Sequence, residues 1–479
     1  MLGSLSKILP RVEVPPEWGV DPVPPLERRM TFRQHFVLWF NLGIGLLVIL
    51  TGALLVLPAE DHGLGMAPRQ ALLAVIVGSI IGVFLLSLMA YAGARVHVPT
   101  MVLLRPVLGI RGSYVPSAFN FLQLVGWTAF ELWAMSWAAN HVAKTMFDFD
   151  AYLLWLVIFA VICTSFALGG PIVVVRQWME KFGIWVMTAA SLWLTYSIVS
   201  SFNLGDVLSQ TSTDGAPFWV GVDLVIAMPI SWIPLVADYS RFGRSDRGAF
   251  AGTGLGYLLA NTWFYGLGVL LVATVTLGDL SNPAVAIAGA IIVFTAGWLA
   301  LLATLAVETD QAFADIYSAA VTAQNVFSRI PQRVFVVIVA VIGLILASFL
   351  NMVTYEIFML LIGSVFISLF GVMAADYFVV RRQEYDSAEL QNREGAYWYL
   401  GGVNWLALLC WAAGVIVYHT VNTNLLSAFE IMGPFVSQVQ DLVPAAFTGY
   451  GGSLPSFVVA FVLYAVLSPL LLRRSDEED

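Results

Sequence analysis

The sequence predicts an all-α polytopic membrane protein with about twelve transmembrane helices. Hydrophobic residues make up 59% of the 479 residues and charged residues only 11%, whereas soluble globular domains carry about 25% charged residues. The apolar residues gather in runs of about 20, the length at which a helix spans a bilayer. Nearly all basic residues fall in alternate loops between these runs, as the positive-inside rule predicts for a helical membrane protein.

Twelve apolar runs are long enough, or nearly so, to cross a membrane. We place them at 36–57, 71–92, 115–141, 151–169, 182–202, 218–238, 253–277, 286–320, 334–350, 354–380, 400–422 and 453–472. The eighth run is long, which favours a single helix that projects into the cytoplasm. The loops between the runs are too short to hold a soluble catalytic domain.

The positions of the lysines and arginines test this topology independently. Of the 22 basic residues, only Arg69 and Lys144 fall on the opposite side. The others precede span one or follow an even-numbered span: Lys7, Arg11, Arg28, Arg29, Arg33, Arg95, Arg105, Arg111, Arg176, Lys181, Arg241, Arg244, Arg247, Arg329, Arg333, Arg381, Arg382, Arg393, Arg473 and Arg474. We therefore expect a plasma (inner) membrane protein with both termini in the cytoplasm, including an N-terminal segment, 1–35, and a tail, 473–479.

Two of the predicted spans contain residues that interrupt helices. Span one, "WFNLGIGLLVILTG", is interrupted by Asn41, Gly43 and Gly45. Span six, "DLVIAMPISWIPLVADYSRF", has at its middle Pro229, Ser231, Trp232 and Pro234. Each proline removes an amide donor and clashes with the preceding turn. Two broken helices five spans apart indicate inverted repeats with a binding site between the breaks, although simple packing of glycine and proline is the alternative, above all for span one.

Span three carries a polar stripe on one face. Asn120, Gln123, Trp127 and Glu131 are three or four residues apart and therefore share a helix face. An ionisable residue in mid-membrane costs about 2–3 kcal/mol even on permissive scales, so Glu131 is expected to have a role. We expect Trp127 to stack on a flat heteroaromatic ligand and Glu131 to accept hydrogen bonds from its N–H groups. The alternatives are packing for Trp127 and a buried structural partner for Glu131.

Span eight holds a second polar cluster, in the stretch "LLATLAVETDQAFADIYSAA". Four oxygen-bearing side chains lie within eight residues: Glu308, Thr309, Asp310 and Asp315. No lysine or arginine lies within the spans to neutralise these acids. Hard oxygen ligands of this kind suit Na⁺, a proton or a cationic substrate.

Four stretches resemble the nucleobase:cation symporter-1 family of cytosine, purine and hydantoin permeases. They are "PLVADYSRFGRS" (234–245), "GVMAADYFVVRR" (371–382), "YAGARVHVPTMVLLRPVLGIRGSYVPS" (91–117) and "QLVGW" (123–127). The resemblance implies a LeuT-type fold, with one five-helix repeat at 36–202, an inverted repeat at 218–380 and two peripheral helices at 400–472. It also implies symport of a heterocycle with Na⁺ or H⁺ as the coupling ion, and no other cofactor.

The resemblance also implies roles for individual residues. In the family's hydantoin branch the motif of helix three is Trp-x-x-x-Gln, which here becomes Trp127-x-x-x-Glu131. The second stacking residue comes from the break in helix six, where Trp232 and Ser231 are the candidates. The resemblance implies a Na⁺ site formed by Asn41, Gly45, Glu308 and Thr309. The expected substrate site comprises Trp127, Glu131, Gln123, Asn41, Ser231, Trp232 and Asp310.

The acid at position 131 indicates which substrates to expect. A carboxylate accepts hydrogen bonds but does not donate them unless it is protonated, whereas glutamine does both. Glu131 therefore favours a ring with an N–H-rich or protonated edge, such as cytosine or a hydroxymethyl aminopyrimidine. The stretches "LWFNLGIGLLVILTGALL" (38–55) and "FADIYSAA" (313–320) also resemble the family's thiamine-precursor pyrimidine permeases.

Other functions are less consistent with the sequence. The alternative is a LeuT-type symporter for another small polar or cationic solute, such as an amino acid or polyamine. No stretch resembles a channel filter, and the five scattered histidines form no catalytic or metal cluster, so we expect no enzyme activity. The expected partners are a small heterocyclic substrate and the lipid bilayer, with no nucleic acid and no obligatory protein partner.

Overall fold

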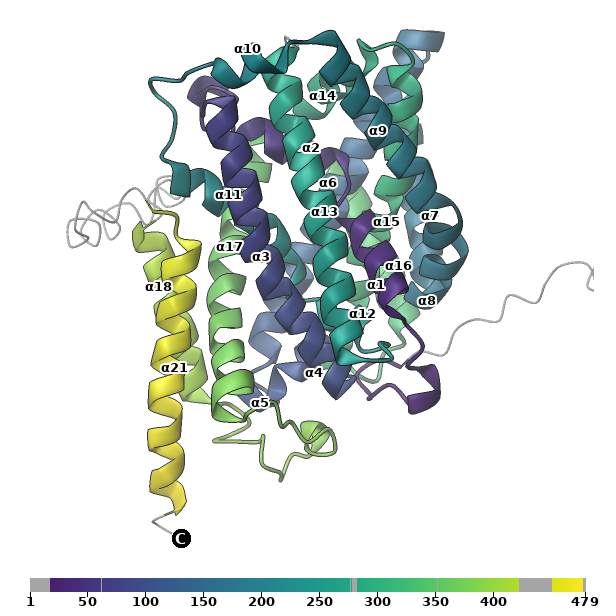
Figure 1. The fold of residues 1–479 in the computed structure, drawn as a ribbon. Helices are drawn as coiled ribbons and strands as arrows, with labels where there is room; N and C mark the ends of the chain where they lie inside the picture. The colour runs from purple at the N-terminus through teal and green to yellow at the C-terminus, as the bar shows by residue number, and fades with distance from the viewer. Residues whose placement is uncertain are drawn as a thin grey trace, which may run out of the picture.

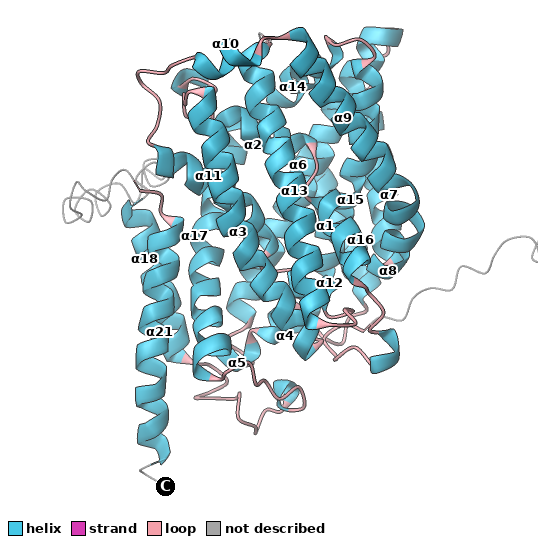
Figure 2. Ribbon diagram, in the orientation of Figure 1, coloured by secondary structure: helices cyan, strands magenta, loops and turns pink. Residues whose placement is uncertain are grey.

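The computed structural model describes residues 18–61, 63–275, 277, 282–350, 352–421 and 450–476. Throughout this part of the chain the regular structure is helical, with two isolated bridges and no β-strand (Figures 1 and 2). The beginning of the predicted N-terminal segment, with Lys7 and Arg11, and the last residues of the predicted tail, 477–479, lie outside the described residues.

The helices follow the predicted spans closely. In chain order they are α1 (Phe32–Leu42), α2 (Leu46–Leu54), α3 (Pro68–Val96), α4 (Thr100–Leu103), α5 (Arg105–Leu108), α6 (Tyr114–Phe147), α7 (Tyr152–Gly169), α8 (Pro171–Val174), α9 (Ile184–Ser201), α10 (Leu204–Ser209), α11 (Phe218–Trp232), α12 (Val236–Ser240), α13 (Asp246–Thr274), α14 (Pro283–Ile292), α15 (Gly297–Val326), α16 (Gln332–Ala347), α17 (Met352–Ala374), α18 (Trp405–Val421) and α21 (Ser453–Asp476). Two π-helical segments, Val175–Gly183 and Ala375–Val380, extend α8 and α17 and were not predicted.

The prediction of a single long eighth helix was wrong. The run 286–320 contains the end of α14, a turn, and most of α15. Ala296 lies in the left-handed region with φ of 60°, and a Cβ on Gly297 would overlap the Ile291 carbonyl oxygen. The turn is made by apolar residues, so hydropathy alone gives no sign of the break.

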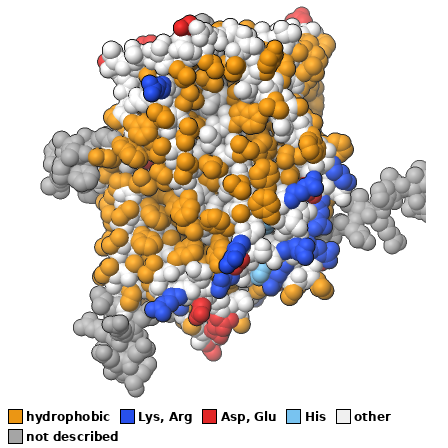
Figure 3. Space-filling model, in the orientation of Figure 1, with side chains coloured by type: hydrophobic (Ala, Val, Ile, Leu, Met, Phe, Trp, Pro, Cys, Tyr) orange, Lys and Arg blue, Asp and Glu red, His pale blue; other side chains and the backbone are white. Residues whose placement is uncertain are grey.

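Several helices are long and apolar enough to cross a membrane. Among the described residues five meet this test, and the pair α1 and α2, bent by 59° at its break, makes a sixth if it is counted as one span. Hydrophobic side chains cover the middle of the face seen in Figure 3, while basic side chains gather toward its lower end. The total of about twelve spans stays a prediction.

The two broken helices lie in corresponding surroundings. Helix α1 packs along α13, and α11 packs along α3. Each broken helix therefore lies against the second helix of the other predicted repeat. Two equivalent halves related by symmetry would make this reciprocal pair of contacts. The long helices α6 and α15 also pack against each other, and α18 and α21 stand beside α17 at one edge of the molecule (Figure 1).

The stretches that resemble the family contact one another at the arginine-rich end. Asp238, after the break in span six, accepts a hydrogen bond from the Thr100 backbone N–H at 2.9 Å, and the Thr100 hydroxyl accepts one from the Ala237 N–H at 3.0 Å. The Tyr91 hydroxyl donates to Gln383 Oε1 at 3.1 Å. These contacts join segments that are far apart in sequence: α4 to α12, and α3 to the turn just after the stretch 371–382.

Arg105 makes the most extensive of these connections. Its Nε and Nη2 donate to Asn325 Oδ1 at 3.1 and 2.8 Å, and its Nη1 donates to the Leu390 carbonyl at 3.0 Å. Burial lowers the pKa of Arg105 to about 10, so the side chain remains charged at neutral pH. A charged donor therefore ties α5 to the end of α15 and to the loop after α17.

We expect Arg105→Met to destabilise the fold by about 2–3 kcal/mol, because buried acceptors lose charged donors. A fall in the thermal unfolding temperature of the purified protein would measure this. Arg247→Met is the matched control, because Arg247 is exposed at the same end of the molecule. Equal losses in the two variants would contradict a structural role for the Arg105 contacts.

Candidate functional site

The break in the first span is built by glycine and held by α15. Helix α1 ends at Leu42 and α2 begins at Leu46, so the predicted interruption is confirmed. The Gln311 amide donates to the Ile44 carbonyl, and Glu308 Oε2 accepts the Leu46 N–H at 2.7 Å. Two side chains of α15 thus satisfy backbone groups that the broken helix leaves without partners.

Gly45 allows this close approach. A Cβ at this position would overlap the Gln311 amide and lie 2.8 Å from the Glu308 carboxylate. The backbone of Gly45 is extended, with φ of 176°, so the requirement for glycine is one of space and not of conformation.

The break in the sixth span lies slightly later than its sequence suggests. Helix α11 continues through Pro229 to Trp232, and α12 begins at Val236, so Pro234 marks the break. Backbone carbonyls at this break accept hydrogen bonds from the polar stripe of α6. The Gln123 amide donates to the Ser231 carbonyl at 3.0 Å, and the Asn120 amide donates to the Pro234 carbonyl at 3.2 Å.

A small pocket lies between the two breaks. It is lined by Leu47, Trp127, Glu131, Met228, Ser231, Trp232, Gln311 and Asp315. Its volume is about 10 Å³, room for about one water molecule. Four of the predicted substrate residues, Trp127, Glu131, Ser231 and Trp232, therefore meet at one place, in a conformation closed around their own side chains.

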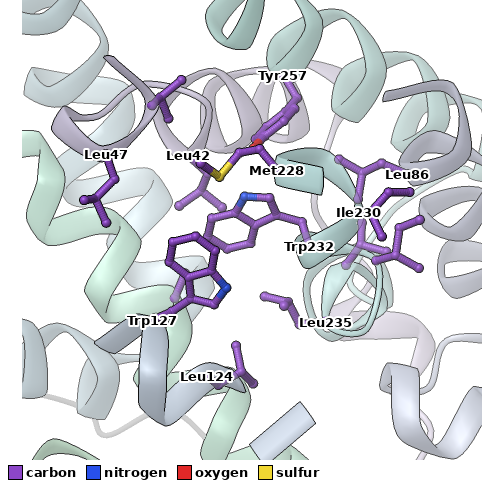
Figure 4. Close-up of a cluster of buried hydrophobic side chains, with 14 of the residues drawn as sticks. Leu42, Leu47, Leu86, Leu124, Trp127, Met228, Ile230, Trp232, Leu235 and Tyr257 are labelled. Carbon is purple, nitrogen blue, oxygen red and sulfur yellow. The ribbon is translucent and has the colours of Figure 1, made fainter. Parts of the chain in front are cut away.

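Both indole rings are held by other aromatic residues. Trp232 lies edge-on to Trp39 with ring centroids 5.7 Å apart, and Trp127 lies edge-on to Phe358 at 5.3 Å. Figure 4 shows Trp127 and Trp232 within one buried cluster, near Met228. These contacts restrict ring rotation, so the two indoles present defined surfaces to the pocket.

Carboxyl groups crowd the same region. Glu131 is 2% exposed, Glu308 0% and Asp315 3%. Glu131 and Glu308 are neighbours in this cluster. None of the three forms a salt bridge with a lysine, arginine or histidine among the described residues. Two buried carboxylates in contact repel each other strongly unless a cation or a shared proton lies between them.

Asn41, Thr309 and Asp310 are among the predicted site residues that do not line the pocket. Asn41 Nδ2 contacts Asp310 Oδ2 at 3.3 Å, and a Cβ on Gly183 would lie 2.9 Å from that Asn41 amide. The Thr309 hydroxyl donates to the Ala306 carbonyl at 2.7 Å. Thr309 lines a separate apolar cavity of about 780 Å³ between α6, α7 and α15.

Of the four predicted Na⁺ ligands, the structure brings together only Gly45 and Glu308. Asn41 pairs with Asp310, and Thr309 faces the apolar cavity. Within the described ranges, no group of three or more histidine, cysteine, aspartate or glutamate side chains is arranged to hold a metal ion. Of the buried acids, Glu308 lies at the helix-one break, and Glu131 lines the neighbouring pocket.

Gln123 holds the helix-six break instead of lining the pocket. Gln311, Asp315, Met228 and Leu47 line the pocket without having been predicted as substrate residues. The sequence contains a signal that Gln311 and Asp315 belong to the site. Residues 308, 311 and 315 are three and four apart, so they share a face of α15 just as the polar stripe shares a face of α6.

The comparisons with known proteins agree with this architecture. The sequence model of the family described as permeases for cytosine/purines, uracil, thiamine and allantoin matches residues 22–442. A hydantoin permease of Microbacterium maritypicum is 28% identical over 367 residues, covering 73% of this chain and 74% of the relative. A cytosine permease of Escherichia coli strain K12 is 25% identical over 363 residues, covering 74% of this chain and 80% of the relative.

Solved structures show the same fold. Mhp1, a nucleobase-cation-symport-1 family transporter solved in a closed conformation with bromovinylhydantoin bound, matches with a TM-score of 0.77 at 22% identity, covering 96% of each chain. A Na⁺-coupled sialic acid symporter matches with a TM-score of 0.60 at 11% identity, covering 93% of this chain and 91% of that one. The fold is therefore a LeuT-type helical transporter fold, and the chain is a multi-pass membrane permease and not an enzyme. Since the family model spans most of its length, this chain belongs to the nucleobase:cation symporter-1 family, the permeases for cytosine and purines, uracil, thiamine and allantoin.

Proposed function

We propose that the protein imports an aminopyrimidine, such as cytosine or a hydroxymethyl aminopyrimidine, by cation symport with alternating access. The observation that carries this proposal is the pocket in which Trp127 and Trp232 meet Glu131 between two broken helices. Two indole rings suit a flat heterocycle, and a pocket with two acids and no basic side chain suits an edge rich in N–H donors.

Glu131 gives the proposal its substrate preference. The carboxylate accepts hydrogen bonds from an exocyclic amine and an adjacent ring N–H, or from a protonated ring. Uracil and xanthine present more acceptor oxygens, which would face the carboxylates of Glu131 and Asp315. Family membership does not favour the alternative of an amino acid or polyamine as cargo.

The contact between Glu131 and Glu308 supports cation coupling. Glu308 accepts the Leu46 N–H beside Gly45, at the break in the first span, while Glu131 lines the substrate pocket. A cation bound at Glu308, either Na⁺ or a proton, would relieve its repulsion of Glu131 and favour the conformation that binds substrate. By linkage, substrate must tighten cation binding by the same factor.

The expected topology indicates which end of the molecule faces the cytoplasm. The arginine-rich end of the molecule, which includes the start of α1, would face the cytoplasm of the plasma (inner) membrane. The pocket would open alternately to each side as the two broken helices move relative to α6 and α15. The cation gradient would then drive accumulation of the heterocycle.

A binding panel tests both parts of the proposal. Purified protein is titrated calorimetrically with cytosine, hydroxymethyl aminopyrimidine, uracil and hypoxanthine, with and without Na⁺, at two pH values. We expect an aminopyrimidine to bind at least about tenfold more tightly than uracil, because one charge-assisted hydrogen bond contributes about 1.5–3 kcal/mol.

The outcomes test the proposed cation and the proposed substrate separately. Binding that strengthens with Na⁺ supports sodium coupling, and binding that changes only with pH supports proton coupling. Binding indifferent to both contradicts the cation proposal. Preference for uracil or hypoxanthine contradicts the proposed role of Glu131.

A further inference from the structure

A basic cleft lies at the arginine-rich end of the molecule, away from the transport pocket. Its volume is about 640 Å³, and it is lined by Pro25, Leu26, Arg28, Arg29, Thr31, Arg33, Gln34, Arg176, Glu180 and Arg244. Figure 3 shows basic side chains gathered toward the lower end of the molecule. Five arginines from three separate stretches of the chain therefore converge on one concavity.

The charge of the cleft is only partly neutralised by the protein. Arg33 Nε lies 3.5 Å from Glu180 Oε1, and Arg29 Nη2 lies 3.3 Å from Glu27 Oε1. Five arginines against these two glutamates leave a net charge of +3. Neither Arg176 nor Arg244 forms an ion pair with the described residues.

Apolar side chains next to the cleft place it at a membrane surface. Leu26, in its lining, is 81% exposed, and Phe32 at the start of α1 is 45% exposed. Phe182, two residues after Glu180, is 55% exposed. Exposed apolar side chains among arginines are typical of the boundary between lipid hydrocarbon and water, where arginines extend their charges toward headgroups.

We propose that this cleft binds the phosphate headgroup of an anionic phospholipid from the membrane leaflet at the arginine-rich face. Guanidinium groups bind phosphate oxygens in pairs of parallel hydrogen bonds and lose less hydration than an ammonium group does. Arg176 and Arg244, which have no carboxylate partner among the described residues, supply the phosphate contacts, and Leu26 lies against the acyl chain. The arginine-rich face is expected to meet the cytoplasmic leaflet, whose anionic lipids give it a negative surface potential.

The position of the cleft gives the lipid a mechanical role. The Met30 N–H donates to the Phe242 carbonyl and the Arg244 N–H donates to the Met30 carbonyl, both at 2.8 Å. The Gln34 amide donates to Glu180 Oε2 at 3.4 Å. The cleft therefore lies where the start of α1 meets the chain after α12 and the π-helical segment before α9. A headgroup that bridges Arg176 and Arg244 holds these three parts together.

The test compares lipid binding by two double variants and the unmodified protein. Native mass spectrometry counts phosphatidylglycerol and phosphatidylcholine molecules retained after delipidation and titration. We expect the Arg176→Gln/Arg244→Gln variant to bind phosphatidylglycerol about thirtyfold more weakly, since each of the two arginines near a membrane surface contributes about 1 kcal/mol. The matched control is Arg382→Gln/Arg393→Gln, which removes two exposed arginines outside the cleft.

A second measurement follows the thermal unfolding temperature in phosphatidylcholine nanodiscs with and without phosphatidylglycerol. Phosphatidylglycerol should stabilise the unmodified protein and the control but have less effect on the cleft variant, and Arg176→Lys/Arg244→Lys should restore part of the effect. An equal loss of phosphatidylglycerol binding in the control would show that the effect comes from general surface charge, and this would overturn the proposal. Stabilisation by dissolved inorganic phosphate without any retained lipid would assign the cleft to a free anion and would also overturn it. Because neither readout requires transport, the result is independent of the proposed substrate.

Discussion

Gly45→Ala is expected to abolish uptake. The added Cβ would overlap the Gln311 amide and press on the Glu308 carboxylate at 2.8 Å. Relief of that overlap requires the ends of the Gln311 and Glu308 side chains to move away from the break in the first span. Glu308 then loses the Leu46 N–H and Gln311 loses the Ile44 carbonyl. The proposed cation site and one wall of the pocket are disrupted together.

Uptake of labelled substrate into proteoliposomes measures this effect, with the thermal unfolding temperature as the check on folding. Gly266→Ala is the matched control, because its Cβ would meet only Leu72 Cδ2 at an ordinary 3.7 Å. In the middle of α13 that change should be neutral or stabilise by up to about 1 kcal/mol. Normal uptake by Gly45→Ala would show that the close approach at the break is unnecessary for transport.

Glu308→Gln is expected to separate substrate binding from the cation. A glutamine at this position still accepts the Leu46 N–H through its carbonyl oxygen, so the break in the first span remains satisfied. The negative charge beside Glu131 disappears, and no cation is required to neutralise it. Substrate affinity should therefore become independent of the cation, whereas coupling between two ligands typically changes affinity by about 5–150-fold.

Two assays on the same proteoliposomes check this expectation. Exchange of labelled for unlabelled substrate should persist in Glu308→Gln, while accumulation against a gradient should be lost. Glu131→Gln is the companion variant. It removes the other charge of the contact but lies in the pocket, so its main effect should be a change in substrate preference. A Glu308→Gln protein whose binding retains its full cation dependence would exclude Glu308 from the cation site.

The sequence predicted the positions of the helices well because they depend on short-range patterns. Apolar runs and alternating basic loops located the helices, and glycine and proline located both broken spans. The pocket residues of α6 followed from their spacing on one helix face. The stretches that resemble the family include Asp238 and Arg105, which connect helices far apart in the sequence in this structure.

The positions of individual residues within the site depend on tertiary contacts, which the spacing of residues along the sequence does not reveal. Glu308, Thr309 and Asp310 are consecutive, so on a helix they point in different directions. Only Glu308 faces the break in the first span, while Thr309 faces an apolar cavity and Asp310 pairs with Asn41. The turn before α15 was also missed, because apolar residues form it.

Three amide side chains hold the two broken helices, and of these only Gln311 also lines the pocket. Asn120 and Gln123 of α6 bind the carbonyls of the second break, and Gln311 of α15 binds that of the first. Leu47, Met228 and Asp315 line the pocket, and none of them is a partner in these amide contacts. A combinatorial library aimed at a new cargo would therefore keep the three amides fixed and randomise those three positions. Directed evolution at these three positions could therefore change substrate selectivity and leave both helix breaks intact.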